Sequence, residues 1–291
     1  MIKLKIGTSK RALLDFWRRY RKNRAAVVGF LGVALALFIA VCAHVVYPYD
    51  PFGMRLQEAG QSYVTPSSEH VMGTDQFGRD VFGRTLYGIR TSLFVGVSAA
   101  LISALLGITL GAIAGYKGGV TDEIIMRAVD ANLTIPTFFL ALVIVAMFGS
   151  SISFVALVIG FTMWPSTSRL IRAEFLLFKE QTFVESARAV GCGDAHIIFR
   201  EILPNAIFPA VVNLSLQIAM AILDEVSLSF LGLGDPNQIS LGMMLNEAMP
   251  SFRRAWWLGV FPGLVISALV ISFNLVGDGI NDALNPHLKE R

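Results

Sequence analysis

Polar side chains lie inside an otherwise apolar stretch near position 217, and they are the residues of this chain best suited to bind a solute or a proton. Asn213, Gln217 and Asp224 follow one another at intervals of four and seven residues. At about 100° per residue, this spacing places all three within about 40° on one helical face. Glu225 lies beside them on another face. Polar and ionisable side chains at membrane depth mark ion or substrate pathways, so these four residues are candidates for lining a translocation pathway.

Other interpretations of the same residues stay open. Asn213 and Gln217 are of a kind that more often forms hydrogen bonds between helices than binds substrate. If the apolar span ends near position 223, both acids lie at the outer membrane interface. A transporter driven by an ion gradient would instead titrate Asp224 or Glu225, but it would have paired halves with broken helices. The sequence contains no internal repeat of that kind.

Motifs for covalent chemistry are absent from the sequence. There is no Gly-x-x-x-x-Gly-Lys-Ser/Thr phosphate loop, no His-Glu-x-x-His or Cys-x-x-Cys metal spacing, and no Gly-x-Ser-x-Gly nucleophile motif. The four histidines are scattered along the chain. We therefore predict no catalytic residue, no metal site and no directly bound cofactor, and we do not expect an enzyme.

A polar segment between two long apolar runs has the pattern of a short exposed helix. It reads Glu185-Ser186-Ala187-Arg188-Ala189-Val190-Gly191 and continues, after nine more residues, with Glu201-Ile202-Leu203-Pro204. Thr182 is expected to cap this helix, Glu185 falls in the first turn where the helix dipole favours an acid, and Gly191 suits a left-handed stop. Such a helix can dock rigidly in a groove of another protein. A solvated loop with one helical turn is the alternative.

The elements that position these residues are predicted to be membrane-spanning helices. Of the 291 residues, 54% are hydrophobic and 15% are charged, a balance that a soluble domain of this length could not bury in one core. A helix needs about 20 mostly apolar residues to cross a bilayer. Six windows of about that length occur, namely Ala25–Tyr47, Thr91–Tyr116, Ala131–Gly149, Ile152–Arg172, Asn205–Phe230 and Trp256–Gly277. We expect an all-α, polytopic membrane bundle with about six transmembrane helices.

Basic residues concentrate before the first of these windows, at Lys3, Lys5, Lys10, Arg11, Arg18, Arg19, Arg21, Lys22 and Arg24. Because cytoplasmic flanks carry an excess of Lys and Arg, residues 1–24 are predicted to form a cytoplasmic basic segment, and residues 25–291 one transmembrane domain. Alternation of the spans places residues 48–90 outside, residues 173–204 inside and both chain ends in the cytoplasm. Apolar residues at helical spacing within the basic segment favour a helix on the membrane surface, with a plain basic anchor as the alternative.

Small residues and prolines predict how the spans pack. A stripe of small residues at intervals of four lets another helix approach closely, and it consists of Ser103, Gly107, Gly111 and Gly115. Pro136 is expected to kink its span, with Asn132 and Thr134 helping to satisfy the carbonyl that loses its donor. Residues 231–234, which contain two glycines, are expected to turn the chain out of the membrane.

Helical spacing also predicts two ion pairs, Asp80 with Arg84 and Arg127 with Asp130. The first pair is expected on an external helix capped by the threonine or the aspartate at positions 74 and 75. We expect both pairs to support the structure.

The polar inner segment resembles the Glu-Ala-Ala-x-x-x-Gly, nine residues, Ile-x-Leu-Pro signature of permease subunits of bacterial and archaeal ABC importers. Ser186 replaces the middle alanine, and Glu201 stands where the pattern has isoleucine. In that family the segment forms a coupling helix that docks in a cleft of the ATPase subunit. The resemblance therefore implies an ATPase-coupling role for the residues at the signature positions, which are Glu185, Ser186, Ala187, Gly191, Leu203 and Pro204.

Three further stretches narrow the resemblance to the second, C-type permease of dipeptide, oligopeptide and nickel transport systems; they are Gly73–Leu93, Gly115–Pro136 and Ser227–Gly234. The resemblance implies a type I importer permease that forms half of a pathway for di- or oligopeptides in a prokaryotic plasma membrane. The implied partners are a homologous second permease, two cytoplasmic ATPase subunits that bind ATP and Mg²⁺, and an extracytoplasmic substrate-binding protein. No nucleic acid is implied.

Overall fold

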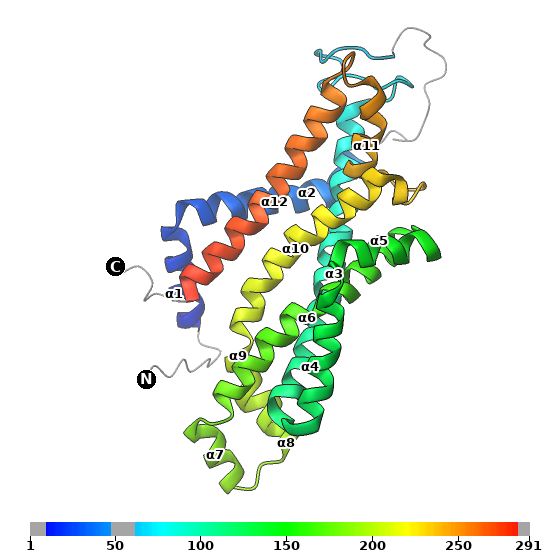
Figure 1. The fold of residues 1–291 in the computed structure, drawn as a ribbon. Coiled ribbons are helices and arrows are strands. Elements are labelled where there is room, and N and C mark those ends of the chain that lie inside the picture. Colours follow the sequence, from blue (N-terminus) through cyan, green and yellow to red (C-terminus); the bar gives the residue numbers. More distant parts are fainter. Residues whose placement is uncertain (1–9, 48–61, 285–291) are drawn as a thin grey trace.

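The computed structural model describes residues 10–47 and 62–284, and most of these lie in helices (Figure 1). Within those ranges the only β pairing is an isolated bridge between Thr74 and Asp80. The helices in chain order are α1 (Lys10–Lys22), α2 (Arg24–Val46), α3 (Val81–Lys117), α4 (Gly119–Thr134), α5 (Thr137–Phe148), α6 (Ile152–Phe178), α7 (Thr182–Ala189), α8 (Asp194–His196), the π-helical η1 (Ile197–Ile202), α9 (Leu203–Ala206), α10 (Phe208–Leu228), the π-helical η2 (Ser229–Leu233), α11 (Leu241–Ala248), the 3₁₀-helical η3 (Met249–Ser251) and α12 (Trp257–Leu284).

Five helices of the described chain are long and apolar enough to cross a membrane. They are α2, α3, α6, α12 and the continuous α10 and η2. The pair α4 and α5 passes the same test together, but its two halves meet at an angle of 82°. The predicted all-α, multi-span architecture is therefore confirmed, with five spans or six if the bent pair is one span.

The bend between α4 and α5 lies at Pro136, as the sequence predicts. Ile135, which precedes the proline, has an extended backbone (φ −96°, ψ 127°), because the proline ring disfavours the helical conformation of the residue before it. The Thr134 hydroxyl donates to the Asp130 carbonyl at 2.9 Å. The carbonyl of Asn132, which Pro136 leaves without its helical donor, accepts from the Ile135 amide at 3.3 Å. The Thr134 side chain therefore bonds to the carbonyl of Asp130 and not, as predicted, to the carbonyl that Pro136 leaves without a donor.

Several helices extend well beyond the predicted apolar windows. α3 begins at Val81, ten residues before the window, because the Asp80 carboxylate caps it by accepting from the Gly83 amide at 2.9 Å. The prediction of a cap at positions 74 or 75 is wrong. α6 and α12 also continue past their windows to Phe178 and Leu284. The external segment predicted over 48–90 thus ends in nearly three turns of helix, and its residues 48–61 lie outside the described part of the chain.

α3 and α6 pack at very short range along the predicted stripe of small residues. A Cβ atom added to Gly107, Gly111 or Gly115 would lie 2.5–2.6 Å from atoms of Thr167, Ser168 or Phe175 on α6. Helices in lipid associate through such close packing because no hydrophobic driving force acts between them. The stripe therefore lets α3 and α6 pack in close contact within the bundle.

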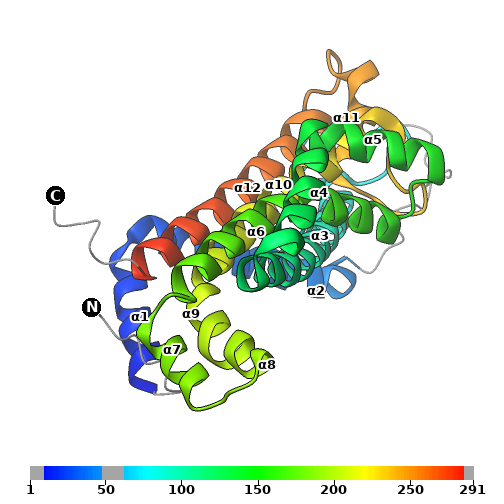
Figure 2. The ribbon, with the colours of Figure 1, turned by 60° about the horizontal axis from the view of Figure 1, so that its bottom comes forward.

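The two ends of the bundle carry different structures. α11 and the described residues of the predicted external segment lie at one end, at the top in Figure 1, and α7 and α8 lie at the other. Figure 2 brings α7, α8 and α9 forward. α1 forms the predicted N-terminal helix and packs against the last turns of α12, where Tyr20 fits against Gly279. Residues 1–9 of the predicted basic segment and residues 285–291 at the C-terminus lie outside the described chain.

Candidate functional site

The predicted inner helix exists as α7, a helix of eight residues with a glycine stop. Gln181 occupies the N-cap position, so Thr182 is the first helical residue and the predicted threonine cap is wrong. Glu185 lies in the first turn, as expected. Gly191 has φ of +87°, and the Cys192 amide donates to the Ala187 carbonyl at 3.0 Å. This left-handed ending, which glycine adopts without strain, gives the helix a defined end.

α7 has one face bound to the bundle and another free. Val184 is fully buried, and Ala187 packs against the cluster of apolar side chains around Phe175 and Ile202. Glu185 and Ser186 are exposed. Val190 is 84% exposed and projects from the end of the helix. Sequence reasoning missed Val190, although an apolar residue directly before the glycine of a polar segment is a signal that the sequence contains.

The second half of the signature anchors the segment. Leu203 packs against the same apolar cluster, and Pro204 follows it where the π-helical η1 passes into α9. Glu201, which replaces the isoleucine of the signature, lies 3.5 Å from His196 at the surface. Buried Ile197 and Ile202 fill the core beside it, so the acid does not interrupt the apolar packing.

Asn213 and Gln217 lie side by side on the face of α10 that contacts α6. The Gln217 amide donates to the Thr167 hydroxyl at 3.0 Å and to the Ser166 hydroxyl at 3.1 Å, and Asn213 donates to Thr167 at 3.2 Å. The Gln217 Oε1 atom is buried without a hydrogen-bond partner. Ser166 is exposed, so this polar patch reaches the surface between the two helices.

The two acids of α10 lie in different surroundings from that patch. Glu225 is 3% exposed and accepts hydrogen bonds from Ser92 of α3 at 2.8 Å and from Ser229 at 2.7 Å. It lines a small hollow that Asp235 also borders. Asp224 is half-buried. The structure therefore brings Asn213 and Gln217 together near Thr167, and it does not bring the acids to the same place.

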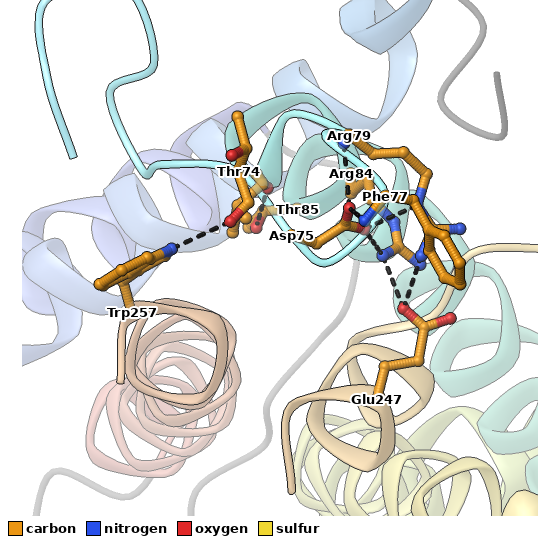
Figure 3. A network of polar contacts seen from close by, with 9 residues as sticks. Thr74, Asp75, Phe77, Arg79, Arg84, Thr85, Glu247 and Trp257 are labelled. Carbon is orange, nitrogen blue, oxygen red and sulfur yellow. Dashed lines mark hydrogen bonds and ion pairs between the residues drawn. The ribbon is translucent and has the colours of Figure 1, made fainter. Parts of the chain in front are cut away.

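A cluster of four charges lies at the end of the molecule that carries α11, with Asp75 and Arg84 buried and Arg79 and Glu247 partly buried (Figure 3). Asp75 accepts from Arg79 at 2.6 Å and from Arg84 at 2.7 Å. Glu247 of α11 accepts from Arg84 at 2.6 Å and from Arg79 at 3.0 Å. The predicted pairing of Arg84 with Asp80 is therefore wrong, because Asp80 is occupied as the helix cap and Arg84 points to the other acids. We call these four residues the external ion cluster, after the predicted external segment that contains three of them.

The second predicted ion pair is also wrong. Asp130 pairs with Arg169 of α6 at 2.5 Å, and Arg127 lies 3.8 Å from Glu123 on its own helix. A further ion pair joins α4 to α6, between Asp122 and Arg172. The ion pairs of Asp130 and Asp122 hold α4 against α6, which an ion pair within α4 could not do.

Neither cysteine is in a disulfide, and Cys42 in α2 and Cys192 after α7 are both partly buried. Across residues 10–47 and 62–284, no group of three or more His, Cys, Asp or Glu side chains is arranged to hold a metal ion.

A helical bundle with five or six candidate spans, a glycine-terminated helix exposed at one end and an ion cluster at the other define a polytopic membrane protein and suit a transport subunit. Known proteins support this class. Residues 107–290 match the family described as binding-protein-dependent transport system inner membrane component, and residues 12–66 match the N-terminal TM domain of oligopeptide transport permease C.

Individual relatives align along almost the whole chain. The glutathione transport system permease protein GsiD of Pectobacterium atrosepticum is 41% identical over 280 residues, covering 94% of this chain and 91% of the relative. The dipeptide transport system permease protein DppC of Escherichia coli is 42% identical over 286 residues, covering 96% and 94%. DppC of Haemophilus influenzae is 38% identical over 287 residues, covering 97% of both chains.

The chain belongs to the family of inner membrane permeases of binding-protein-dependent transport systems, and its predicted membership among their C-type subunits is confirmed. It is a multi-span permease subunit of an ABC importer and not an enzyme.

Proposed function

We propose that this chain forms half of the pathway through which short peptides enter the cell, in a complex with a homologous second permease, two ATPase subunits and an extracytoplasmic binding protein. The names of the relatives, which transport dipeptides and glutathione, support short peptides over nickel chelates as the substrate. ATP and Mg²⁺ are expected on the ATPase subunits alone, with no cofactor on this chain.

We propose further that α7 docks in the ATPase subunit and transmits its movement to the bundle. The observation that carries this proposal is the combination of a buried inner face at Val184 with a free end at Val190, Glu185 and Ser186. A helix held firmly on one side and exposed on the other transmits a force instead of bending. An exposed valine at its end also supplies the apolar contact that a protein groove binds.

The pathway is proposed to run along α10 on the side that faces α6. Asn213 and Gln217, with the exposed Ser166, supply polar groups at the middle of the bundle. Asp224 lies two turns further along the same face, and Glu225 faces the hollow near the outer end. Hydroxyl and amide groups suit a solute with a peptide backbone, because both donate and accept hydrogen bonds.

Val190→Asp tests the docking proposal with little risk to folding, because the Val190 side chain is exposed. The chain is expressed with its neighbouring transport genes and purified, and the co-purified ATPase is quantified. Placing a charge in an apolar contact is expected to lower the captured ATPase about tenfold or more. The matched control is Val71→Asp, which makes the same change at an exposed valine of the external end and should leave capture unchanged.

Capture of equal ATPase by both variants would contradict docking at α7. The rival mechanism makes a separate prediction: a secondary transporter would move labelled dipeptide into liposomes on an ion gradient with no ATPase present. The proposed importer is expected to require ATP, the ATPase subunits and the binding protein together. Competition by unlabelled peptide or by a nickel chelate then identifies the substrate class.

A further inference from the structure

Tyr116, in the last turn of α3, contacts both legs of the segment that contains α7. Its hydroxyl donates to the Asp194 carboxylate at 2.6 Å, and the Arg188 guanidinium lies 5.8 Å from the centre of its ring. Arg188 belongs to α7, whereas Asp194 opens the returning leg at α8. One side chain of α3 therefore joins the two sides of the turn at Gly191.

Two glycines, Gly191 and Gly193, lie in the chain between these two legs. Gly191 has φ of +87°, and neither Gly191 nor Gly193 would have any atom within 4 Å of an added Cβ. Glycine permits a wide range of backbone conformations, so a force on the end of α7 can be absorbed by rotation at these two residues. Tyr116 links Arg188 to Asp194 across this stretch and limits that rotation.

α3 is suited to carry a movement from this point to the other side of the membrane. It runs without proline from Val81 to Lys117, a length of about 55 Å at 1.5 Å per residue. Gly107, Gly111 and Gly115 fix its inner half closely against α6. Near its outer end, Arg84 is 3% exposed and bonded to Asp75 and Glu247.

We propose that Tyr116 is a positioning residue through which α7 displaces α3, and that α3 carries this displacement to the external ion cluster at Arg84. The inference rests on the proposed function, since the force at α7 must come from a docked ATPase. It assigns to Tyr116 a role in coupling and none in substrate binding. Loss of its hydroxyl should therefore separate ATP hydrolysis from transport.

Tyr116→Phe tests the inference in the complete complex, reconstituted in liposomes with ATPase subunits, partner permease and binding protein. The measured quantity is the amount of labelled dipeptide imported per ATP hydrolysed. We expect this ratio to fall roughly three- to tenfold, the range that corresponds to loss of one hydrogen bond, while ATPase capture stays normal. Tyr87→Phe is the matched control, because it removes a hydroxyl bonded to the Tyr47 carbonyl at the other end of α3, and it should leave the ratio unchanged.

Substitutions at Asp194 identify the hydrogen bond itself as the cause. Asp194→Asn keeps an oxygen acceptor and should preserve most of the ratio, whereas Asp194→Ala should lower it as Tyr116→Phe does. The double variant Tyr116→Phe, Asp194→Ala should be no worse than either single variant, because both remove the same contact. Additive losses would show that the two residues act separately and would overturn the inference.

A reporter at the external end tests the second half of the inference. Gln76 is exposed beside the external ion cluster, so Gln76→Cys, in a chain whose native cysteines are replaced by alanine, reports movement there through its rate of maleimide labelling. ATP should change this rate in the otherwise unaltered complex and change it much less in the Tyr116→Phe complex. An equal response to ATP in both complexes would overturn the inference.

Failure of the inference can be distinguished from failure of the proposed function. If Val190→Asp leaves ATPase capture intact, docking at α7 fails. If Val190→Asp abolishes capture but Tyr116→Phe behaves like Tyr87→Phe, docking stands and the role of Tyr116 fails. A loss of ATPase capture in Tyr116→Phe would also contradict the inference, because it would make Tyr116 a residue of the docking surface.

Discussion

Arg84 joins two parts of the chain that are far apart in the sequence. Its guanidinium lies between Asp75, nine positions away, and Glu247, which is 163 positions away. Removing one partner from a buried ion cluster leaves the remaining charges without compensation. We therefore expect Arg84→Met to lower the free energy of unfolding by about 3 kcal/mol, seen as a lower midpoint of thermal unfolding of the purified protein.

Arg127 supplies the matched control for that measurement. Its side chain is 79% exposed and lies 3.8 Å from Glu123, and an exposed pair of this kind contributes less than about 1 kcal/mol. Arg127→Met should therefore leave the midpoint nearly unchanged. Equal midpoints for the two variants would mean that the external ion cluster does not stabilise the fold.

At the scale of single residues, the sequence predicted local backbone features correctly but predicted ion-pair partners wrongly. The suitability of Glu185 for a first turn and of Gly191 for a left-handed stop depends on local backbone geometry, and both predictions are confirmed. The ion-pair partners of Arg84 and Asp130 were predicted wrongly, since helical spacing identifies only neighbours on the same helix. Glu247 has no local sequence signal that connects it with Arg84.

The contact between α3 and α6 makes a prediction at the scale of elements. A Cβ atom at Gly111 would lie 2.5 Å from the Ser168 carbonyl oxygen, a backbone atom that moves only if α6 moves. Gly111→Ala is therefore expected to cost about 1–3 kcal/mol of stability, measured by thermal unfolding and by the yield of folded protein.

Gly263 of α12 is the matched control, because nothing lies within 4 Å of its added Cβ. Gly263→Ala should be neutral or stabilising by up to about 1 kcal/mol, since alanine is the better helix former. If Gly111→Ala unfolds at the same temperature as Gly263→Ala, then α3 and α6 are not tightly joined. The role proposed for α3 as a rigid element would lose its basis.

Element boundaries depended on signals of different kinds. Pro136 divides α4 from α5 because proline acts on its own neighbours, so the break was predictable although its angle of 82° was not. α3 begins ten residues before its apolar window because Asp80 caps it and Arg84 is neutralised there by acids from elsewhere. A hydropathy window cannot show a helical turn whose charges are compensated through tertiary contacts.

At the scale of the whole molecule, the proposed orientation places α7 in the cytoplasm and α11 outside. Single cysteines test it in a chain whose native cysteines, Cys42 and Cys192, are replaced by alanine. Val190→Cys and Met249→Cys place thiols at positions that are 84% and 61% exposed, at opposite ends of the bundle. In spheroplasts that express the chain without the ATPase subunits, we expect a membrane-impermeant maleimide to label the thiol at position 249 when they are intact, and that at position 190 only after permeabilisation. The reverse pattern would invert the topology and with it the docking proposal.

The sequence by itself determined the membrane location, the number of long apolar helices to within one, the break at Pro136 and the short glycine-ended helix α7. These features follow from hydrophobicity and from backbone rules that act over a few residues. The tertiary structure alone decided that Arg84 bonds to Glu247, that Asp130 bonds to Arg169, that Tyr116 reaches Asp194 and that Val190 stays free. Such pairings depend on how distant helices cross, and the crossing is set by the packing of many side chains at once, which no local pattern records.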